Sequence, residues 1–437
     1  MTELVHEIAG PSDLRQLHRE YPSRYPFLLQ STGRGGALNR YDILFAFPGE
    51  AVVAGTGVDF LDELDARWLQ ERTDTDASKL PFTGGWFLYL GYELAAEIEP
   101  GLQLKPDTIL PAAFAVRCLV GLVFDHQESR CFLVCETPGC VNKDQLKADI
   151  ASLRRDCFAA SAKVLSVQEE EPTLFTDAVV RAKEYIAEGD VYQANLSREW
   201  AALMDGAPDA SDLYEALCKS NPGPFAGMAR WCDIEIISSS PERLLEVRDG
   251  VASTRPIAGT RPRSDDVALD DNLSAEVFAH PKERAEHIML VDLERNDLGR
   301  ICEPGTVEVS EMMVLESYAH VHHIVSNVQG QLRSDVTPGE AIAAVFPGGT
   351  ITGCPKVRCM EIISELEQGP RGAYTGYFGY LNRDGSLDLN ILIRTIVKQG
   401  NKVTFRAGSG IVADSDPEAE LEETRAKAEG MLRAIAR

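Results

Sequence analysis

Acidic side chains recur in pairs, three residues apart, in two segments of the chain. Glu283 and Glu286 lie in one predicted helix, and Glu420 and Glu423 lie in another near the C-terminus. Residues three apart share one face of a helix, so carboxylates from two such helices can hold a Mg²⁺ ion whose coordination is completed by water. Solvated surface charge would explain one pair alone better, and Glu423 with Lys427 also has the spacing of an ordinary helical ion pair. Two pairs in a chain that also carries the loops described below favour the metal site.

Glu242 and Arg394 interrupt apolar stretches of the chain. Glu242 follows the apolar run at residues 234–237, and a carboxyl group at a strand end beside the core is a candidate for a raised pKa and general-acid catalysis. An exposed turn residue is the alternative. Arg394 lies in the apolar stretch 391–396, which we predict to be a strand. A guanidinium group in such surroundings needs an anion, which is either a carboxylate of the protein or a carboxylate of a substrate.

Short glycine motifs at Gly259-Thr260 and at residues 408–410 can bring backbone N–H groups close to an anion, although most such motifs are turns. The chain has no G-x-x-x-x-G-K-[ST] sequence and no complete G-x-G-x-x-G sequence after a strand, so nucleotide binding has little support. Tyr374, ahead of a glycine, fits a packed strand aromatic. A cluster of histidines, explained better by hydrogen-bonded strand residues than by a metal site, comprises His320, His322 and His323.

The composition narrows the class of protein. The 437 residues are enough to bury a large core, and 68 acidic against 43 basic side chains give a net charge of −25. Such a chain has no basic field to gather the phosphates of a nucleic acid. Its 10 cysteines match no zinc spacing and indicate a reducing cytoplasm. No signal-peptide pattern and no stretch of membrane-spanning length are present. We therefore expect a cytoplasmic protein that binds neither nucleic acid nor membrane.

The elements that must position these residues alternate between strands and helices. An acidic run at residues 166–172 ends in proline and is predicted to be a connection. The predicted strands cover residues 40–47, 84–92, 116–124 and 191–203, and a predicted hairpin pairs residues 374–381 with 387–397 across residues 382–385. The predicted helices begin after a cap at Thr176, at Pro281, at Val357, and at Pro417 after a cap at Asp416 or Ser415. Antiparallel strands mixed with helices favour an α+β fold.

Several segments after the acidic run match one family in residue type and order. They are residues 189–197, 240–243, 256–261, 281–287, 291–300 and 413–415. From about Phe175 to the C-terminus the chain resembles the chorismate-utilising family that contains anthranilate synthase, aminodeoxychorismate synthase, isochorismate synthase and salicylate synthase. Residues 27–31 and 84–92 resemble the N-terminal region of that family less strongly.

The resemblance implies a fold. It is the α+β sandwich of anthranilate synthase component I, in which two antiparallel β-sheets pack together with helices outside. It also implies an N-terminal region at residues 1–165, interwoven with a chorismate-binding catalytic region at residues 172–437. A tryptophan pocket, regulatory or structural, is expected near Ser31 and the loop at residues 221–225.

The same resemblance implies roles for individual residues. Glu286 and Glu423 would hold a Mg²⁺ ion, with Glu283 and Glu420 supporting its waters. Glu242 would protonate the departing 4-hydroxyl group of chorismate. The residues expected at the ring and its carboxylate are Gly259, Thr260 and His323. The residues expected at the enolpyruvyl carboxylate are Tyr374, Arg394, Gly408, Gly410 and Lys427.

Gln193 and Ala258 restrict the chemistry that the resemblance implies. Members of the family that add water at C2 carry a lysine base where this chain has Gln193. A glutamine cannot take a proton from water at neutral pH, so ammonia is the expected nucleophile. The chain has no amidotransferase-type nucleophile loop, so a separate glutamine amidotransferase subunit would supply that ammonia. Most aminodeoxychorismate synthases carry a lysine at the place of Ala258, and a methyl group there excludes the covalent adduct that this lysine forms at C2.

The loop at residues 346–356 resembles the PGGSITGAPK form of aminodeoxychorismate synthases rather than the PAGTLSGAPK form of anthranilate synthases. A subgroup of aminodeoxychorismate synthases with the sequence PIAGT resembles this combination. The expected reaction is therefore amination of chorismate to 4-amino-4-deoxychorismate, through non-covalent 2-amino-2-deoxyisochorismate, for p-aminobenzoate and folate synthesis. The alternatives are anthranilate synthase component I, which releases pyruvate, a synthase that stops at 2-amino-2-deoxyisochorismate, and a non-catalytic module that binds chorismate.

Overall fold

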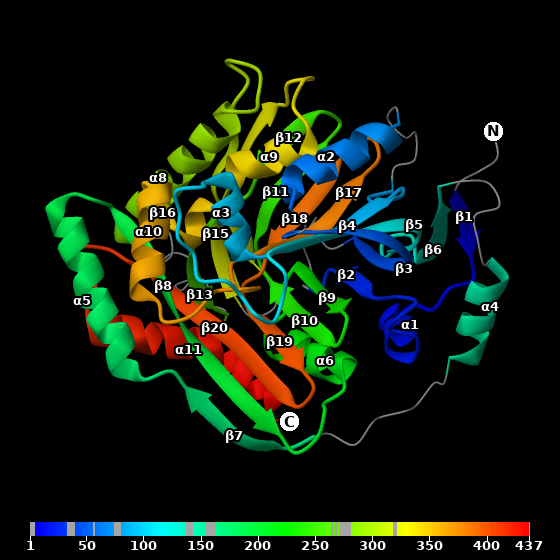
Figure 1. Ribbon diagram of the computed structural model, residues 1–437, viewed down its shortest axis with the longest axis horizontal. Helices are drawn as coiled ribbons and strands as arrows, with labels where there is room; N and C mark the ends of the chain where they lie inside the picture. Colours follow the sequence, from blue (N-terminus) through cyan, green and yellow to red (C-terminus); the bar gives the residue numbers. More distant parts are fainter. Residues whose placement is uncertain are drawn as a thin grey trace.

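The computed structural model describes residues 5–32, 40–55, 57–73, 80–136, 143–153, 162–263, 266, 270, 281–317 and 321–436, with the backbone alone at 143, 258, 260–262, 281–283 and 321. Within this part of the chain, 20 strands are connected in one hydrogen-bonded network. The pairs are antiparallel, and they form two sheets that face each other. Helices lie outside (Figure 1). The α+β sandwich of two antiparallel sheets is therefore confirmed.

The first sheet begins at an edge strand, β7, and continues in space through β8, β20, β19, β10, β9 and β2 to β3. A short strand, β16 (Gly353–Cys354), pairs with the beginning of β8. The bounds of the strands are β7 (Val164–Glu169), β8 (Gln193–Met204), β20 (Lys402–Ile411), β19 (Thr395–Gln399), β10 (Ile234–Ser240), β9 (Phe225–Trp231), β2 (Phe27–Gln30) and β3 (Tyr41–Val53).

The second sheet begins with β14 and β13 on either side of β15 and continues through β12, β11, β18, β17 and β4 to β5. The bounds are β14 (Glu308–Ser317), β13 (Ile257–Pro262), β15 (Val321–Gln331), β12 (Val251–Thr254), β11 (Arg243–Arg248), β18 (Leu387–Ile391), β17 (Tyr377–Asn382), β4 (Gly85–Leu90) and β5 (Ala113–Asp125). Beyond β5, the strands β6 (Arg130–Cys135) and β1 (Val5–Ile8) complete the network.

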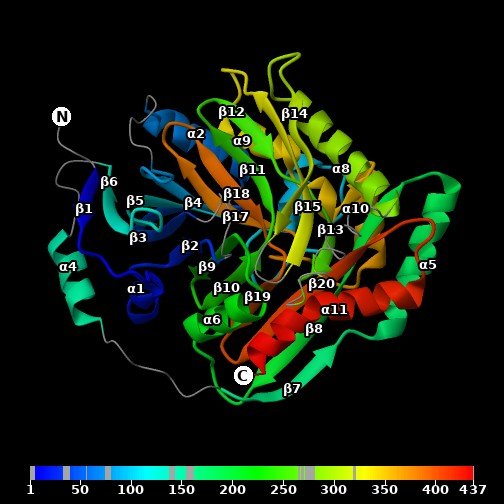
Figure 2. The same ribbon diagram turned by 180° about the vertical axis from the view of Figure 1, so that it is seen from behind.

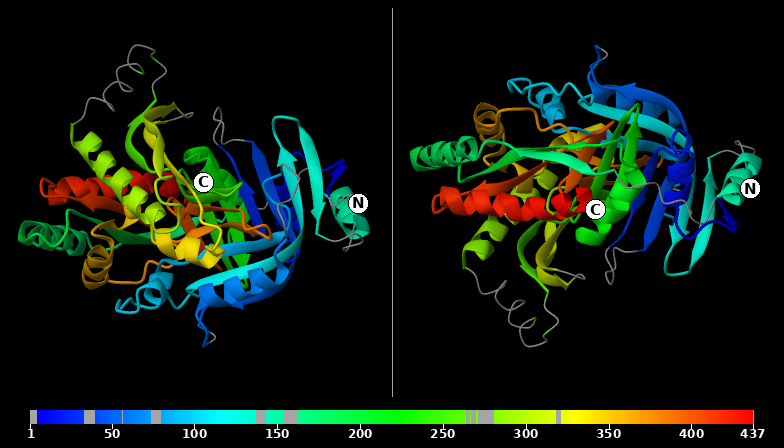
Figure 3. Two further views of the ribbon diagram at one scale, coloured as in Figure 1. Left: turned by 90° about the horizontal axis from the view of Figure 1, so that it is seen from above. Right: turned by 90° about the horizontal axis from the view of Figure 1, so that it is seen from below.

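The pair β3–β5 joins the two sheets. Both strands are 13 residues long, and they pair from Tyr41↔Asp125 to Val53↔Phe114 with an irregularity between Pro48 and Ala51. The other edge of β5 is shared, because its first half pairs with β4 and its second half pairs with β6. The long strands curve around one side of the molecule (Figure 3). A long strand can therefore belong to both sheets, and the two faces of the sandwich are parts of one folded sheet.

Aromatic side chains fill the space between the sheets. Phe27 of β2 and Phe87 of β4 stack with their ring centroids 4.0 Å apart and their planes 1° apart. Phe45 meets Phe87 edge-on, with centroids 5.4 Å apart, and Phe378 of β17 lies 5.9 Å from the same ring. These rings belong to one buried cluster that also contains Ile236 of β10. Stacked and edge-to-face rings contribute beyond the area that they bury, so this cluster holds the two sheets together.

Helices cover the outer face of each sheet, which gives four layers. The helices α5 (Pro172–Glu188), α6 (Ala210–Ser220) and α11 (Pro417–Ile435) pack on the first sheet (Figure 2). The helices α2 (Phe60–Glu71), α8 (Pro281–Gly299) and α9 (Pro338–Val345) pack on the second sheet. The remaining short or peripheral helices are α1 (Arg15–Glu20), η1 (Tyr92–Leu94), α3 (Ala95–Ile98), α4 (Lys143–Ser152), η2 (Gly349–Ile351) and α10 (Lys356–Leu366). No helix in the described part of the chain is long and apolar enough to span a membrane.

Local capping signals place several helices where the sequence predicts them. The carboxylate of Asp416 accepts a hydrogen bond from the backbone N–H of Ala419 at 3.0 Å, and Pro417 is the first helical residue of α11. Pro281 begins α8, as predicted. The α5 helix ends at Gly189, whose φ of 86° is left-handed and suits a residue without a Cβ. These predictions rest on backbone geometry of single turns, and the structure confirms them.

Three local predictions are wrong. The acidic run at 166–172 is not a simple connection, because its first part pairs with β8 as strand β7. The α5 helix starts at Pro172 and not after Thr176, whose hydroxyl donates to the carbonyl of Thr173 inside the helix at 3.2 Å. The stretch 387–397 is two strands, since the chain breaks at residues 392–394 and moves from β18 to β19. The division at residues 165 and 172 stays a prediction.

We predict that Phe87→Ala lowers the free energy of unfolding by about 3–5 kcal/mol, because it removes a fully buried ring from the joint between the sheets. Denaturant unfolding of the purified protein measures this change. Leu165→Ala, at a side chain that is 62% exposed on the edge strand β7, is the control and should change the free energy by less than about 0.5 kcal/mol. Equal effects of the two substitutions would show that the aromatic cluster is not the joint.

Candidate active site

The chain passes between the two sheets twice at the same place. β10 of the first sheet leads directly into β11 of the second, and β18 of the second leads into β19 of the first. The two passages are hydrogen-bonded, because the N–H of Ile391 donates to the carbonyl of Glu242 at 3.0 Å and the N–H of Ser239 donates to the carbonyl of Arg394 at 3.2 Å. We call this place the crossing. It brings the carboxyl group of Glu242 close to the guanidinium of Arg394, which is 152 positions later in the sequence. The proximity of the two groups is therefore a consequence of the tertiary fold.

Glu242 is a buried acid. Only 6% of the residue is exposed, and burial raises the pKa of its carboxyl group to about 7. Three neighbours oppose that rise: the side chain of Thr350, the backbone N–H of Ile257 and the charge of Arg394. A carboxyl group with a pKa near neutrality is about half protonated at pH 7, which suits a general acid. The exposed-turn alternative for Glu242 is excluded by its burial.

Arg394 provides the cation of the crossing. Its φ of 53° is left-handed, which the chain adopts where it turns from β18 to β19. Burial lowers the pKa of its guanidinium group to about 10, and the charge of Glu242 opposes that shift. Among the described residues, none forms a side-chain hydrogen bond or an ion pair with this guanidinium, so Glu242 influences it without neutralising it. A partly buried cation with unused donors suits the carboxylate of a ligand.

Two glycines of β20 make room beside the crossing. A Cβ at Gly408 would lie 2.7 Å from the hydroxyl of Tyr374 and 2.5 Å from the carbonyl oxygen of Leu196. A Cβ at Gly410 would lie 2.5 Å from Nε2 of Gln193 and 3.6 Å from Oε1 of Glu286. Any larger residue at either position would displace these groups. The glycines of β20 therefore allow the side chains of Tyr374 and Gln193 to lie against this strand, where a Cβ would collide with them.

The C-terminal helix reaches the same strand. The ammonium of Lys427 donates to the carbonyl of Gly408 at 3.1 Å and lies 2.7 Å from Oε1 of Glu423. The ordinary helical ion pair considered for Glu423 and Lys427 is thus present, and both side chains are about half exposed. Lys427 is nevertheless beside one of the predicted substrate residues. Tyr374 is buried, and burial raises the pKa of its hydroxyl to about 12, so it stays protonated and can donate.

Gln193 contacts one of the predicted metal ligands. Its Nε2 donates to Oε1 of Glu286 at 3.2 Å, and only 2% of the residue is exposed. Its carbonyl oxygen Oε1 is buried and has no hydrogen-bond partner among the described residues. A buried acceptor without a donor costs free energy unless a ligand supplies the hydrogen. Gln193 therefore presents an acceptor for which the described residues provide no donor.

The four predicted metal ligands lie on two helices, as expected. Glu286 is half-buried on α8, while Glu420 is buried and Glu423 exposed on α11. The side chain of Glu283 lies outside the described residues. Within the described part of the chain, no three His, Cys, Asp or Glu side chains lie close enough to one another to hold a metal. The donor type fits Mg²⁺, since all four are carboxylates, and the set remains a prediction.

The histidines and the PIAGT segment lie on neighbouring strands. His323 of β15 is opposite Thr260 of β13 in the strand register. Burial lowers the pKa of His323 to about 4, with the charge of Arg394 acting in the same direction, so the ring is neutral at pH 7. Gly259 has a φ of 74° at a β-bulge that turns the backbone of this segment. The side chains of Ala258 and Thr260 lie outside the described residues, as does His320.

His322 differs from its neighbour. Its Nδ1 and the hydroxyl of Ser317 are 2.8 Å apart, and its Nε2 lies 3.0 Å from Oδ1 of Asp270. This is the hydrogen-bonded strand histidine that the sequence favours. It contributes to the packing of β15 and not to the site.

Thr350 and a buried acidic patch behind the crossing, formed by Glu294 and Asp297, were not predicted from the sequence. Thr350 lies in the loop at residues 346–356, and its side chain lowers the pKa of Glu242, although its hydroxyl forms no hydrogen bond within the described part of the chain. Glu294 and Asp297 of α8 are both buried, and burial raises the pKa of each carboxyl group, that of Glu294 to about 8. Their positions in the segment at residues 291–300 were the only available signal.

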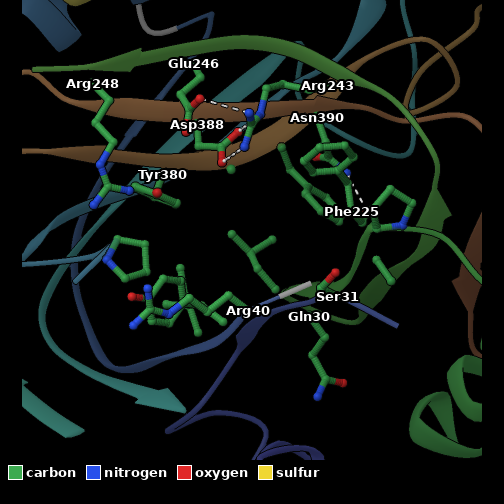
Figure 4. A pocket seen from close by; sticks show the side chains of 18 residues that line it. Gln30, Ser31, Arg40, Phe225, Arg243, Glu246, Arg248, Tyr380, Asp388 and Asn390 are labelled. Atoms are coloured by element: carbon green, nitrogen blue, oxygen red, sulfur yellow. Dashed lines mark hydrogen bonds and ion pairs between the residues drawn. The ribbon is translucent and has the colours of Figure 1, made fainter. Parts of the chain in front are cut away.

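A cavity of about 250 Å³ lies beside Arg243 of β11 (Figure 4). Ser31 and Phe225, where a tryptophan pocket is expected, both line it. Arg243, the residue after Glu242, forms the opposite wall with its guanidinium 2.9 Å from Asp388 and 2.9 Å from Glu246. The location of a cavity at these residues is confirmed, and its ligand stays a prediction.

Comparison with known proteins supports one family. Residues 25–433 match the family of chorismate binding enzymes. The chain is 44% identical to the anthranilate synthase component I-like protein of Synechocystis sp., over 82% of this chain and 73% of that one. It is 37% identical to aminodeoxychorismate synthase component 1 of Bacillus subtilis, over 97% of this chain and 94% of that one.

A solved structure extends this result to the fold. The crystal structure of anthranilate synthase component I from Streptococcus pneumoniae superimposes with a TM-score of 0.79 and 31% identity, covering 91% of this chain and 93% of that one. The two proteins thus share their fold over nearly the whole of this chain. In this chain that fold contains Glu242 and Arg394 at the crossing, the two helical carboxylate pairs and the close-packed glycines. The chain belongs to the family of chorismate binding enzymes.

Proposed function

We propose that the protein is the large subunit of an aminodeoxychorismate synthase. It aminates chorismate to 4-amino-4-deoxychorismate, with ammonia from a separate glutamine amidotransferase subunit, in the cytoplasmic synthesis of p-aminobenzoate and folate. The observation that carries this proposal is Gln193, whose buried carbonyl oxygen has no donor among the described residues. An amide cannot deprotonate water, whereas its oxygen can accept a hydrogen bond from ammonia. Addition of ammonia is therefore favoured over addition of water.

The crossing supplies the acid chemistry of the proposed reaction. Ammonia forms a bond to C2 of chorismate while the bond to the 4-hydroxyl group breaks, and the proton of Glu242 leaves with that hydroxyl as water. The ammonium group formed at C2 then releases one proton to solvent, which leaves the amine. Arg394, Tyr374 and the backbone of β20 bind the enolpyruvyl carboxylate. A Mg²⁺ ion held by Glu286 and Glu423, with Glu283 and Glu420 behind its waters, would bind the ring carboxylate and draw electrons from the ring.

The second amination sets the product apart from anthranilate. A second ammonia bonds to C4 of the enzyme-bound 2-amino-2-deoxyisochorismate and expels the amine at C2. Ala258 has no amine that could take part, so both steps use free ammonia. The B. subtilis relative that bears the name aminodeoxychorismate synthase component 1 aligns with 97% of this chain, which supports this product.

The second candidate is anthranilate synthase component I, in which the same intermediate loses pyruvate. The names of the Synechocystis relative and of the S. pneumoniae structure favour it. So does Ala258, because the resemblance assigns alanine at this position to anthranilate synthases. The two candidates share every residue of the crossing, so only the product separates them.

We expect purified protein incubated with chorismate, Mg²⁺ and excess ammonium at mildly alkaline pH to form 4-amino-4-deoxychorismate, detected by mass spectrometry. Added lyase should convert this product to p-aminobenzoate. Anthranilate fluorescence with stoichiometric pyruvate would overturn the proposal in favour of the second candidate. Isochorismate formed without ammonium would contradict the role given to Gln193, and binding without turnover would support the non-catalytic alternative.

We expect kcat to fall as the pH rises through about 7, because Glu242 must be protonated to act as an acid and its pKa is raised to about 7. The concentration of unprotonated ammonia is held constant across the series. Glu242→Gln should lower kcat by about 10²–10⁴-fold and abolish this pH limb. Its melting temperature at pH 8 should not fall, since a carboxyl group whose pKa is raised by folding costs stability above its unfolded pKa. A limb unchanged in the variant would remove Glu242 from the acid role.

Removal of divalent cations with a chelator should abolish turnover, and added Mg²⁺ should restore it. Glu286→Gln should raise the Mg²⁺ concentration needed for half-maximal rate, because it removes one carboxylate from the proposed set. Glu418→Gln, at an exposed acid in the first turn of the same C-terminal helix that carries Glu420 and Glu423, is the matched control and should leave that concentration unchanged. Full activity in the presence of chelator would contradict the metal site.

A further inference from the structure

A single buried ammonium connects three helices behind the crossing. Nζ of Lys356, the first residue of α10, lies 2.6 Å from Oδ2 of Asp297 on α8. The same nitrogen donates to the carbonyl of Val345, the last residue of α9, at 3.1 Å. The side chains of Lys356 and Asp297 are 13% and 4% exposed. An ion pair this deeply placed, with a further hydrogen bond to the backbone, holds its members in one geometry.

The loop at residues 346–355 begins after Val345 and ends before Lys356, so this ammonium holds both of its ends. Between the ends, the loop packs closely on α8, because a Cβ at Gly349 would lie 2.1 Å from Cδ2 of Leu293. The N–H of Gly348 donates to the hydroxyl of Tyr377. A loop held at both ends and pressed against a helix has little freedom, and its position follows the position of α8.

Thr350 is the part of the loop that reaches the reacting acid. Its side chain lowers the pKa of Glu242 against the effect of burial, although its hydroxyl forms no hydrogen bond among the described residues. The loop is also packed beside the crossing, because a Cβ at Gly348 would lie 3.2 Å from Cδ1 of Leu244 and 3.6 Å from Cδ1 of Ile391. Its carbonyl accepts a hydrogen bond from Nδ2 of Asn195 at 3.4 Å, and the N–H of Asn195 donates to the carbonyl of Thr352 at 2.8 Å. The loop is thereby attached to β8, the strand that begins with Gln193.

Lys356 also balances the charge of the acidic patch. Burial raises the pKa of Asp297, and the charge of Lys356 is the largest influence in the opposite direction, with Arg300 adding to it. Glu294, one turn earlier on α8, has its pKa raised by burial, by Asp297 and by Glu242, with Lys356 again opposing. Without the ammonium, the carboxylate of Asp297 would be buried without its ion-pair partner.

We propose that Lys356 is a positioning residue, which binds Asp297 and the Val345 carbonyl to fix the loop at residues 346–355 and so keep Thr350 beside Glu242. Lys356 does not touch the substrate. This inference rests on the proposed function, since it requires that Glu242 be the acid of the reaction. Lys356 lies outside the substrate site, and the proposal makes the pKa of Glu242 depend on it.

The test compares pH profiles of kcat for chorismate consumption, whatever the product, with unprotonated ammonia held constant. Lys356→Met should lower kcat by about 10- to 100-fold, with a smaller effect on KM. Its high-pH limb should move upward by about one pH unit, because Glu242 loses a group that stabilises its charged form. Thr350→Val should move the limb in the same way, and the double variant should move it no further. Lys356→Arg, which keeps the charge, should restore the limb and part of kcat.

A matched control comes from the first sheet. Lys398 of β19 and Glu235 of β10 also form an ion pair, with side chains 10% and 12% exposed, and this pair does not touch the loop. Lys398→Met should leave both kcat and the limb as in the wild-type enzyme. Should Lys356→Met fail to fold, the variant with Asp297→Asn in addition, which removes both buried charges, takes its place.

The outcomes separate the inference from the proposed function. If the wild-type enzyme does not consume chorismate, the proposed function fails, and the pKa of Glu242 is then followed by carboxyl ¹³C NMR, with Glu242→Gln identifying its resonance. An upward shift of that pKa in Lys356→Met supports the inference without any turnover. If the wild-type enzyme is active and Lys356→Met keeps the wild-type kcat and limb, the inference is overturned. It is overturned equally if kcat falls, the limb stays in place and Lys356→Arg restores nothing.

Discussion

At one point of this sandwich the chain passes from one sheet to the other twice, from β10 to β11 and from β18 to β19. Backbone hydrogen bonds connect these two passages. The N–H of Ile391 donates to the carbonyl of Glu242, and the N–H of Ser239 donates to the carbonyl of Arg394. Glu242 and Arg394 lie between strands, so their carbonyls find partners in the other passage. A buried backbone carbonyl without a partner costs free energy, so the crossing forms only when both passages are in place. The side chains of Glu242 and Arg394 are therefore held in the interior by the requirement that the backbone be paired, and the active site is built around this requirement.

The interior position gives the two side chains opposite and complementary properties. Burial raises the pKa of Glu242 to about 7 and lowers that of Arg394 to about 10, and the charge of each residue moderates the shift of the other. A protein with a net charge of −25 repels anions in general. The partly buried cation at Arg394 gives the crossing a local region where an anionic ligand is favoured. The cavity lined by Ser31 and Phe225 also reaches Arg243, the neighbour of Glu242, so a ligand there would contact β11, the strand that begins directly after the acid.

The structure also shows why so many small residues gather near the site. Gly408 and Gly410 allow Tyr374 and Gln193 to approach β20 closely, and Gly349 allows α8 to approach the loop at residues 346–355. Each of these contacts joins segments from different parts of the chain. The loop between α9 and α10, the helix α8 and the strand β8 are fastened to one another by Lys356, Asn195 and Tyr377. The position of the loop beside Glu242 thus depends on side chains that do not line the substrate site.

The sequence by itself determined the family, the helical carboxylate pairs and the helix starts at Pro281 and Pro417. These features depend on residue order or on the geometry of a single turn, which neighbouring residues decide. It also indicated that Glu242 and Arg394 were unusual, because ionisable residues in apolar runs are rare. The predicted strand at residues 391–396 was wrong, because the chain breaks at Arg394 to change sheets. Only the tertiary structure decided that Thr350 faces Glu242, that Gln193 contacts Glu286, and that Lys356 joins α8, α9 and α10. These contacts join residues between 11 and 108 positions apart, and local periodicity carries no information about such pairs.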